Sequence, residues 1–516
     1  MKKLIIIPQI NVHLYEIKTY KNMITFIICL AILILGYAFY SKFIERTFGA
    51  DPDKPTPAYK LNDNVDYIPM PWWRVFLIQF LNIAGLGPIF GALAGAMWGP
   101  VAFVWIVFGT IFGGAVHDYL SGMLSIRHNG LSITEIIGIY LGLTAKQVMR
   151  LFTIVLMVLV GAVFITGPAN ILAGLTPDYA TMNFWVAIIF IYYILATLLP
   201  IDKIIGKIYP LFGFALLFMA VGLISALFIK GYQIPELTPK NWHNFHYNSE
   251  QFPIFPMLFI SIACGAISGF HATQSPLMAR CIKNEKEGRR VFYGAMVVEG
   301  VVALIWAAIG MSFFGGVEKL NEVMVAHQGN AAWAVNEISN SLLGKFGGIL
   351  AILGVVAAPI TSGDTAFRSA RLIVADVLKM KQGPIVNRLL ITLPLFAVGF
   401  LLTQINFDII WRYFAWANQT LAAVVLWTIT MYLILNNKRY WITLLPALFM
   451  TYVVSSYILL APEGFSLSKP LSYIGGALIT ACCFIAFLIY QQKLEKKEIV
   501  LQQPAYIEEQ KNKMTK

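Results

Sequence analysis

Two long apolar segments of this chain are each interrupted by glycines near the middle. The first spans residues 75–96 and breaks at 85–88, and the second spans 254–280 and breaks between 265 and 269, so they begin about 180 residues apart. A membrane-spanning helix that unwinds at its midpoint frees N–H and C=O groups that lipid cannot satisfy, so the break must line a cavity or lie buried in protein. Interrupted segments at corresponding positions in two halves of a chain indicate the binding site of a secondary transporter.

The composition of the chain also indicates a membrane protein. Of its 516 residues 58% are hydrophobic and only 12% are charged, and the mean hydropathy is +0.71. Soluble proteins carry about 25% charged residues. The net charge of +12 is explained by basic residues in cytoplasmic loops rather than by binding to nucleic acid. No Walker A, GxSxG or HExxH motif is present, so no enzymatic activity is expected.

Thirteen apolar segments are predicted to span the membrane, which takes about 20 apolar residues each. They form one leading span, two groups of five and two closing spans, and the third spans of the two groups are predicted at 148–173 and 347–362. Because five is odd, the two groups have opposite orientations, which predicts an inverted-topology repeat with a discontinuous first helix in each half. The predicted parts are an N-terminal extension (1–23), a leading helix with a cytoplasmic loop (24–74), repeat one (75–229), repeat two (254–435), two C-terminal helices (441–490) and a cytoplasmic tail (491–516).

The distribution of basic residues predicts the orientation. If the loop after the first span is inside, the inside segments hold 28 of the 38 lysines and arginines, and the outside segments hold ten. The opposite orientation inverts this ratio and violates the positive-inside rule. We therefore expect an all-α polytopic membrane protein with its N-terminus outside and its C-terminus in the cytoplasm.

The first break reads NIAGLGPIFG over residues 82–91. Gly85 and Gly87 let the backbone leave helical geometry without a clash of Cβ, and Pro88 suits the first turn of a restarted helix. The N-terminus of that half-helix would point at the midplane, where it can hold a carboxylate. Close packing of helices through small residues is the alternative explanation. Gly85 and Gly87 are the predicted substrate-binding residues of this segment.

The second break, CGAISGFHATQSP over residues 264–276, is too polar for a lipid-facing span. Ser275 and Pro276 are predicted to begin the next helix as its cap and first turn. His271 could carry a proton or bind substrate, or it could be a neutral histidine bonded to a carbonyl freed by the break. The predicted substrate-binding residues of this segment are Ser268, Gly269, Phe270 and His271.

Ionisable residues within spans are functional candidates by default, because charge in a bilayer is costly. His117 and Asp118 adjoin in the second span of repeat one, where they could also form a structural pair facing the loop, and Glu299 lies in the second span of repeat two. Arg412, near the outer end of its span, is explained by snorkelling of its side chain to the interface. The candidates for proton coupling are His117, Asp118, His271 and Asp364.

A polar stretch, APITSGDT over residues 358–365, lies at the inner end of the third span of repeat two. Ala358, Thr361 and Ser362 share one helical face at i, i+3 and i+4. They offer one carbonyl and two hydroxyl oxygens, which suit a hard monovalent cation. Alternatively, the stretch ends a helix and Asp364 caps the next one.

These motifs resemble the bacterial carbon starvation protein A (CstA) family over residues 36 to 435. Besides the two broken segments, the matching stretches are DPDKPTPAYKLNDNVDYIP (51–69), GGAVHDYLSGMLSIRHNG (113–130), TSGDTAFRSARLIVAD (361–376) and WRYFAWANQTLA (411–422). The family is described as inner-membrane transporters linked to peptide uptake and, for some members, to pyruvate uptake. The resemblance implies a secondary active transporter that imports peptides during carbon starvation by ion-coupled symport, with pyruvate or another small carboxylate as the alternative substrate.

The five-plus-five repeat is also similar to the LeuT fold of the APC superfamily. In sodium-coupled members of that fold, one sodium ion lies between the broken first helix and the eighth, held by two backbone carbonyls and an Ala-x-x-Thr-Ser face. Ala358, Thr361 and Ser362 match that face, and the aligned break puts the carbonyls on Leu81 and Ala84. The resemblance implies a sodium site at these five residues, and no other cofactor is expected.

Overall fold

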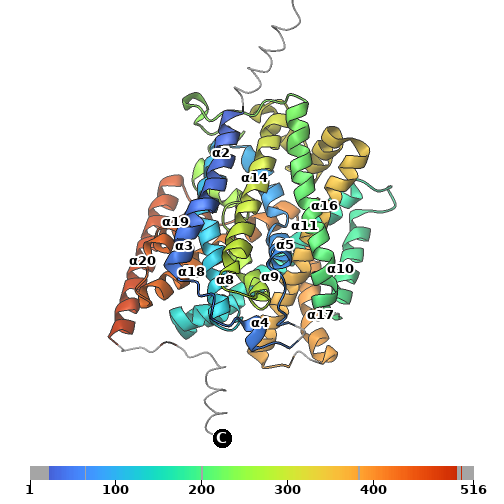
Figure 1. Ribbon diagram of the computed structural model, residues 1–516. Helices are drawn as coiled ribbons and strands as arrows, with labels where there is room; N and C mark the ends of the chain where they lie inside the picture. The colour runs from blue at the N-terminus through green and yellow to red at the C-terminus, as the bar shows by residue number, and fades with distance from the viewer. Residues whose placement is uncertain (1–22, 64–65, 199–200, 382–383, 497–500, 502–516) are drawn as a thin grey trace, which may run out of the picture.

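The chain folds into a bundle of helices that run between two opposite faces of the molecule (Figure 1). The computed structural model describes residues 23–63, 66–198, 201–381, 384–496 and 501. The predicted extension at 1–22 and most of the tail beyond 496 lie outside these residues. Within the described part the only β pairing is an isolated bridge between Met70 and Ile282, so the predicted all-α class is confirmed.

Helices occur at all thirteen predicted positions. The leading span and the first group of five comprise α2 (Ile24–Leu35), η1 (Gly36–Tyr40) and α3 (Ser41–Phe48), then α5 (Trp72–Ile83), η2 (Gly87–Gly91) and α6 (Ala92–Ala96), α7 (Val101–Phe108), η3 (Gly109–Gly114) and α8 (Ala115–Arg127), α9 (Ile133–Ala173), α10 (Met182–Leu198) and α11 (Ile201–Ile229). The second group comprises η5 (Ile254–Leu258), α12 (Phe259–Ser261) and α13 (Gly269–Ala279), then η6 (Arg289–Tyr293) and α14 (Gly294–Phe313), α16 (Ala331–Leu378), α17 (Ile385–Leu402) and α18 (Phe407–Leu435). The closing helices are α19 (Trp441–Leu460) and α20 (Lys469–Glu495), and the connections hold α4 (Pro57–Lys60), η4 (Pro239–Asn241) and α15 (Val317–Ala326).

The number of membrane spans is only partly established by these helices. Among the described residues, nine helices are long and apolar enough to cross a membrane, and a tenth results if the bent pair Trp72–Ile83 and Gly87–Ala96 counts as one. The chain is therefore a polytopic membrane protein. The count of thirteen and the inverted repeat remain predictions.

Two helical stretches extend beyond their predicted spans, and each contains a kink. The spans expected at 148–173 and 347–362 belong to α9 and α16, whose backbone is non-helical at Gly142, with a φ of 89°, and at Gly344, with a φ of 69°, so each consists of two helices joined at a kink. Only glycine adopts such positive φ angles without steric cost. Charged residues near both kinks interrupt the apolar runs, so hydrophobicity alone did not predict these additional helical turns. The alternative role of Asp364 as a helix cap is also wrong, because α16 continues past it to residue 378.

The first break lies where the sequence predicts it. α5 ends at Ile83, and the helix resumes at Gly87 with a bend of 57°. A Cβ atom on Gly87 would come within 2.1 Å of the Cβ atom of Cys264, which belongs to the second break. The two breaks therefore pack directly against each other, and glycine is required at this contact.

The second break is confirmed, but its end was predicted wrongly. α12 ends at Ser261 and α13 begins at Gly269, so Pro276 lies inside α13 rather than in its first turn. The Ser275 hydroxyl donates a hydrogen bond to the carbonyl of His271 at 3.0 Å, one turn earlier in the same helix. Ser275 is therefore part of the helix body and caps nothing.

Two neighbouring side chains of α18 fix the ends of this break. The Asn418 amide oxygen of α18 accepts hydrogen bonds from the Phe270 N–H at 2.7 Å and from the Ser268 hydroxyl at 3.1 Å. The next residue, Gln419, donates to the Phe259 carbonyl at 2.6 Å. The cap that starts α13 thus comes from about 150 residues away in the chain, which explains why local sequence did not reveal it.

The carbonyls freed inside the break are also satisfied. Trp105 Nε1 donates to the Ile262 carbonyl at 3.1 Å, and the Thr110 hydroxyl donates to the Gly265 carbonyl at 3.1 Å. Buried backbone groups need such partners because lipid and apolar side chains offer none. The unwound segment is therefore stabilised by specific hydrogen bonds from neighbouring helices.

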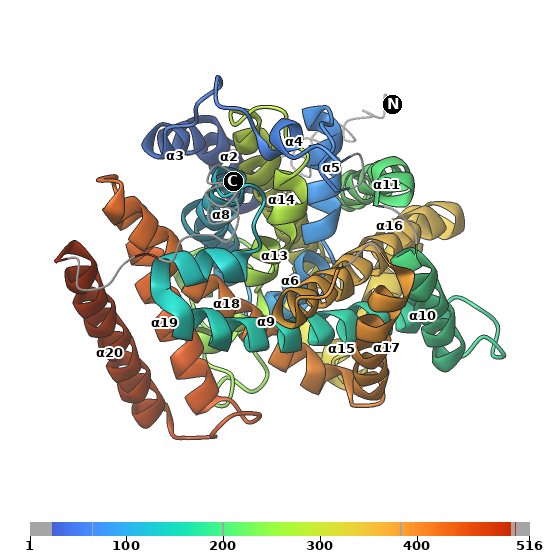
Figure 2. The ribbon, with the colours of Figure 1, turned by 90° about the horizontal axis from the view of Figure 1, so that it is seen from below.

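The loops predicted to be cytoplasmic gather at one face. α2 begins at the opposite face, whereas α4 and the end of α20 lie at this one (Figure 1). Here the Thr56 hydroxyl donates to the Ile282 carbonyl at 2.6 Å, and Arg127 pairs with Glu285 at 2.6 Å. Seen from below (Figure 2), α9 and α16 cross the middle of the molecule, with α19 and α20 on one side and α10 and α17 on the other.

Candidate substrate and ion sites

Four ionisable side chains from three helices form a buried cluster beside the second break. His117 and Asp118 lie on α8, His271 lies near the start of α13 and Glu299 lies on α14. Asp118 accepts from both imidazoles, with His117 Nδ1 at 2.8 Å from Oδ1 and His271 Nδ1 at 2.8 Å from Oδ2. His271 Nε2 lies 3.4 Å from Glu299 Oε2, and all four side chains are 0% exposed.

This geometry can hold a transferable proton. Because His271 Nδ1 donates to Asp118, Nε2 is the nitrogen that faces Glu299, and the contact between them is favourable only if one of the two carries a proton. A buried carboxylate without a cationic or hydrogen-bonding partner would cost several kcal/mol. The favourable contacts among these three helices therefore depend on which of the four groups carry protons. Of the four predicted proton-coupling residues, the structure brings together His117, Asp118 and His271, and it adds Glu299.

Asp364 does not belong to this cluster. It lies on α16 and pairs with Arg368 at 3.8 Å, one turn further along the same helix. The structure thus places it with a separate set of buried charges.

The predicted sodium ligands come together between α5 and α16. The Ser362 hydroxyl lies 3.0 Å from the Leu81 carbonyl oxygen and 2.9 Å from that of Ala358, and the Thr361 hydroxyl donates to the Ala358 carbonyl at 2.8 Å. All four residues are buried, and Ala84 is buried three residues after Leu81 at the end of α5. Neutral carbonyl and hydroxyl oxygens fit a hard monovalent cation. In this conformation the hydroxyls and carbonyls also satisfy one another.

The predicted substrate-binding residues are all enclosed. Gly85, Gly87, Ser268, Gly269, Phe270 and His271 are buried. A Cβ atom on Gly85 would lie 2.6 Å from the Phe164 ring, and Phe164 meets Phe270 edge to face with ring centroids 5.9 Å apart. Aromatic rings therefore occupy the space against the breaks in this conformation.

Further aromatic rings continue this contact toward the face opposite the loops that are predicted to be cytoplasmic, which we call the outer face. Phe164 contacts Phe414 at 5.9 Å, Phe414 contacts Trp411 at 5.5 Å, and Trp411 contacts Phe90 at 6.0 Å between centroids. We call Phe90, Phe164, Phe270, Trp411 and Phe414 the aromatic seal. They form a continuous series of ring contacts that runs from the second break to Trp411 on α18 and Phe90 on η2.

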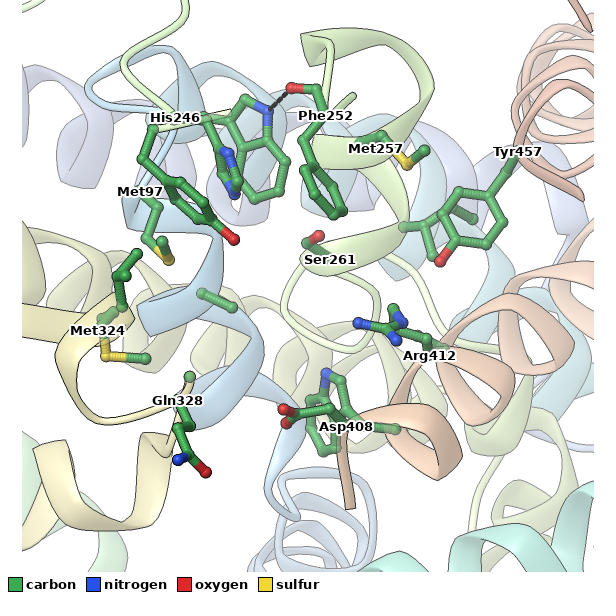
Figure 3. Close-up of a pocket in the computed structure, with 18 residues that line it drawn as sticks. Met97, His246, Phe252, Met257, Ser261, Met324, Gln328, Asp408, Arg412 and Tyr457 are labelled. Atoms are coloured by element: carbon green, nitrogen blue, oxygen red, sulfur yellow. Dashed lines mark hydrogen bonds between the residues drawn. The ribbon is translucent and has the colours of Figure 1, made fainter. Parts of the chain in front are cut away.

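A cavity of about 300 Å³ lies on the outer side of the seal (Figure 3). Its walls come from α6, η5, α12, α15, α18, α19 and the connections that follow α6, α11 and α15, and Trp411 of the seal is among its lining residues. His246 is among its walls, with its ring tilted against that of Trp98 at 4.5 Å between centroids, and burial lowers the pKa of His246 to about 4. The lining residues are Ala94, Met97, Trp98, His246, Tyr247, Phe252, Met257, Ile260, Ser261, Met324, Val325, Gln328, Gly329, Asp408, Trp411, Arg412, Ala415 and Tyr457.

Sequence reasoning missed the charges of this cavity. Arg412 was explained by snorkelling, yet its Nε atom lies 3.3 Å from Glu463 Oε2 and it lines the cavity beside Asp408. Asp408 and Arg412 are four residues apart on α18, a spacing that puts an acid and a base on one helical face. That spacing was the available signal.

Comparison with known proteins agrees with the fold and the motifs. A model of the family "Carbon starvation protein CstA" matches residues 21–182 and 177–338. The chain is 44% identical to an uncharacterized membrane protein of Haemophilus influenzae over 59% of this chain and 95% of that protein. It is 25% identical to the peptide transporter CstA of Bacillus subtilis, over 92% of this chain and 97% of that protein.

A solved structure shares the fold. The manganese transporter of Eremococcus coleocola, of the LeuT fold, matches with a TM-score of 0.50 and 13% identity, over 84% of this chain and 99% of that one. At this identity the likeness concerns the fold alone. The family match over more than half of the residues shows that this chain belongs to the CstA family, which is a family of transporters rather than of enzymes.

Proposed function

We propose that this protein imports short peptides into the bacterial cell by ion-coupled symport. The observation that carries the proposal is the direct packing of two unwound helix segments against each other, beside the buried cluster of Asp118, His271 and Glu299. Unwound segments expose backbone donors and acceptors to a substrate, and buried ionisable groups mark ion and proton pathways. Similarity to the Bacillus subtilis peptide transporter supports peptides as the substrate class.

A proton is the coupling ion that the cluster favours. Its members come from α8, α13 and α14, so a change in protonation alters contacts among three helices at once. Protonation of Glu299 leaves the Asp118–His271 contact as the remaining charged pair, whereas loss of that proton requires His271 to bridge both carboxylates. The position of α13, which begins at the second break, is thereby linked to the protonation state.

Sodium is the second candidate, because the Ser362 hydroxyl and the Leu81 carbonyl meet across 281 positions of the sequence. A sodium ion bound by Leu81, Ala84, Ala358, Thr361 and Ser362 would join α5, which ends at the first break, to α16. It would thus fix two elements that must move during alternating access.

A pyruvate or small-carboxylate symporter is the alternative function. Such a substrate needs one anion site, whereas a peptide also needs an acceptor for its amine. The role in carbon starvation, the inner-membrane location and the N-out, C-in orientation are part of the same proposal.

Uptake into proteoliposomes tests these proposals directly. Purified protein is reconstituted, and accumulation of labelled dialanine and labelled pyruvate is followed under an inward proton gradient or an inward sodium gradient, each imposed alone. We expect accumulation of dialanine above equilibrium under the proton gradient. Accumulation of pyruvate without dialanine would favour the alternative substrate, and failure of both gradients to drive either compound would contradict symport.

A further inference from the structure

The outer cavity presents one acidic and one basic side chain to the same space. Figure 3 shows the Asp408 carboxylate, the Arg412 guanidinium and the Ser261 hydroxyl pointing into it from α18 and α12. Its volume of about 300 Å³ lies at the lower end of the range of roughly 300–1,000 Å³ found for ligand pockets. The cavity is thus large enough for a small zwitterion.

Arg412 is held in place but remains accessible. Its Nε atom pairs with Glu463 at 3.3 Å, and Glu463 accepts a hydrogen bond from the Tyr457 hydroxyl, while its carbonyl accepts one from Tyr413 at 2.9 Å. The Glu463 side chain is 6% exposed, whereas that of Arg412 is 39% exposed. The guanidinium is therefore anchored from one side and can offer its remaining N–H donors to a ligand.

We propose that this cavity is an entry site that binds a short peptide by both of its charged ends. The carboxylate of the peptide would bind Arg412 and its ammonium group would bind Asp408. This inference rests on the proposed peptide transport and specifies how substrate is recognised before the breaks open. Guanidinium–carboxylate contacts are strong and directional because two parallel hydrogen bonds can form.

The residues that carry the two charges are spaced on the scale of a dipeptide. Backbone positions four residues apart on a helix are separated by about 6 Å along its axis, since each residue rises about 1.5 Å. Two extended residues span about 7 Å. A dipeptide can therefore contact both charges at once, whereas pyruvate would contact Arg412 and leave Asp408 without a cation from the substrate.

The rest of the wall suits side chains of different sizes. Met97, Met257 and Met324 line the cavity, and methionine is flexible and adapts to irregular shapes. The main-chain ends of a peptide would thus be fixed by charge while its side chains vary.

The entry site also adjoins the seal. Trp411 lies between Asp408 and Arg412 in the sequence and contacts Phe90 of the restarted half-helix at 6.0 Å. A peptide held on α18 therefore rests directly beside the rings of the seal.

The test compares substitutions in the protein with blocking groups on the peptide. Uptake kinetics in proteoliposomes are measured for dialanine, N-acetyl-dialanine and dialanine amide, using the unsubstituted protein and the variants Asp408→Asn, Arg412→Gln and Arg412→Lys. We expect Asp408→Asn to raise the KM for dialanine roughly tenfold, the scale of a lost charged hydrogen bond, with no further effect on N-acetyl-dialanine. Arg412→Gln should likewise raise the KM for dialanine, with no further effect on dialanine amide, which lacks the carboxylate. Arg412→Lys should retain part of the affinity for dialanine.

Two controls separate this inference from its alternatives. Glu463→Gln keeps both charges that face the substrate. If this variant and Arg412→Gln both reach the membrane in smaller amounts than the unsubstituted protein, loss of the Arg412–Glu463 pair impairs folding. The KM of Asp408→Asn for dialanine would then decide whether the entry site exists. Dialanine uptake with a KM unchanged by Asp408→Asn and Arg412→Gln would overturn the entry site and leave peptide transport standing. Absence of dialanine uptake by the unsubstituted protein would overturn the proposed function itself.

Discussion

His271 Nδ1 lies 2.8 Å from Asp118 Oδ2, which joins the start of α13 to the first turn of α8 across 153 positions of the sequence. His271 is the third residue of the helix that follows the second break, so this contact fixes where that helix begins relative to repeat one. Glu299 Oε2 lies 3.4 Å from the other nitrogen of the same ring, Nε2. A single imidazole is therefore shared by two carboxylates on two helices.

The first prediction concerns this shared ring. Glu299→Gln removes the carboxylate that can exchange a proton with His271 Nε2 and keeps its size. We expect at least a tenfold loss of dialanine accumulation driven by a proton gradient, while exchange of labelled for unlabelled dialanine at equal pH continues. Glu322→Gln is the matched control, because Glu322 is exposed on α15 and pairs only with Lys319 in the described contacts. Full proton-driven accumulation by the Glu299→Gln protein would refute the proton-coupling role.

The second prediction concerns glycine at the breaks. A Cβ atom on Gly269 would lie 2.4 Å from the Asn418 carbonyl oxygen, and one on Gly85 would lie 2.6 Å from the Phe164 ring. The clash at Gly269 is with backbone, and the clash at Gly85 is with a fully buried ring that is packed between Phe270 and Phe414, so neither neighbour can move aside cheaply. We therefore expect Gly269→Leu and Gly85→Leu to abolish uptake while membrane insertion continues. Gly222→Ala is the control, since its nearest neighbour would be 3.9 Å away. The substrate role of the breaks fails if both leucine variants transport normally at equal membrane levels.

The third prediction concerns orientation. Lys286 lies exposed in the loop between α13 and α14, and Ser249 lies exposed in the connection between α11 and η5. In a variant without Cys281, we expect Lys286→Cys to resist impermeant thiol reagents in whole cells and to react after the membrane is opened. Ser249→Cys should react in whole cells. Labelling of Lys286→Cys from outside would reverse the assigned topology.

The fourth prediction concerns pH and stability. Burial lowers the pKa of His246 to about 4, from an ordinary value of about 6.5. Between pH 6.5 and 4 the unfolded chain therefore takes up a proton at His246, while the folded protein does not. The contribution of neutral His246 to the free energy of unfolding is full above pH 6.5 and is lost as the pH falls toward 4. We expect His246→Gln to show a smaller drop in the thermal unfolding midpoint between pH 7.5 and 4.5. Identical drops in both proteins would show that His246 does not titrate as proposed.

The sequence predicted those features that depend on local pattern or on burial of charge. The breaks were predicted because glycine interrupts an apolar run. His117, Asp118 and His271 were predicted because an ionisable residue within a bilayer is energetically costly and is usually kept for a function. The meeting of Ser362 with Leu81 followed from the resemblance to a known fold.

Features that depend on distant partners were not predictable from local pattern. α13 begins at Gly269 rather than at Ser275 because Asn418, on another helix, accepts from the Phe270 N–H. Arg412 looked like an interfacial side chain because its partner Glu463 lies beyond α19. In both cases the deciding hydrogen bond or ion pair joins residues that only the folded chain brings together.

The last prediction separates sodium from proton coupling. Thr361→Val combined with Ser362→Ala removes both hydroxyls of the α5–α16 contact and leaves Asp118, His271 and Glu299 unchanged. The Leu81 carbonyl then loses its partner at 3.0 Å, which costs about 1 kcal/mol of stability, so reconstitution is first checked by the amount of folded protein. If sodium is the coupling ion, the double variant should lose accumulation driven by a sodium gradient, because two of five oxygen ligands are missing and no others replace the water shell of the ion. If protons are the coupling ion, proton-driven accumulation should persist at a similar level and removal of sodium should change nothing. Uptake driven by either gradient is measured in the same preparation, so loss of both in the double variant would show instead that the contact between α5 and α16 is required for the transport cycle whichever ion is bound.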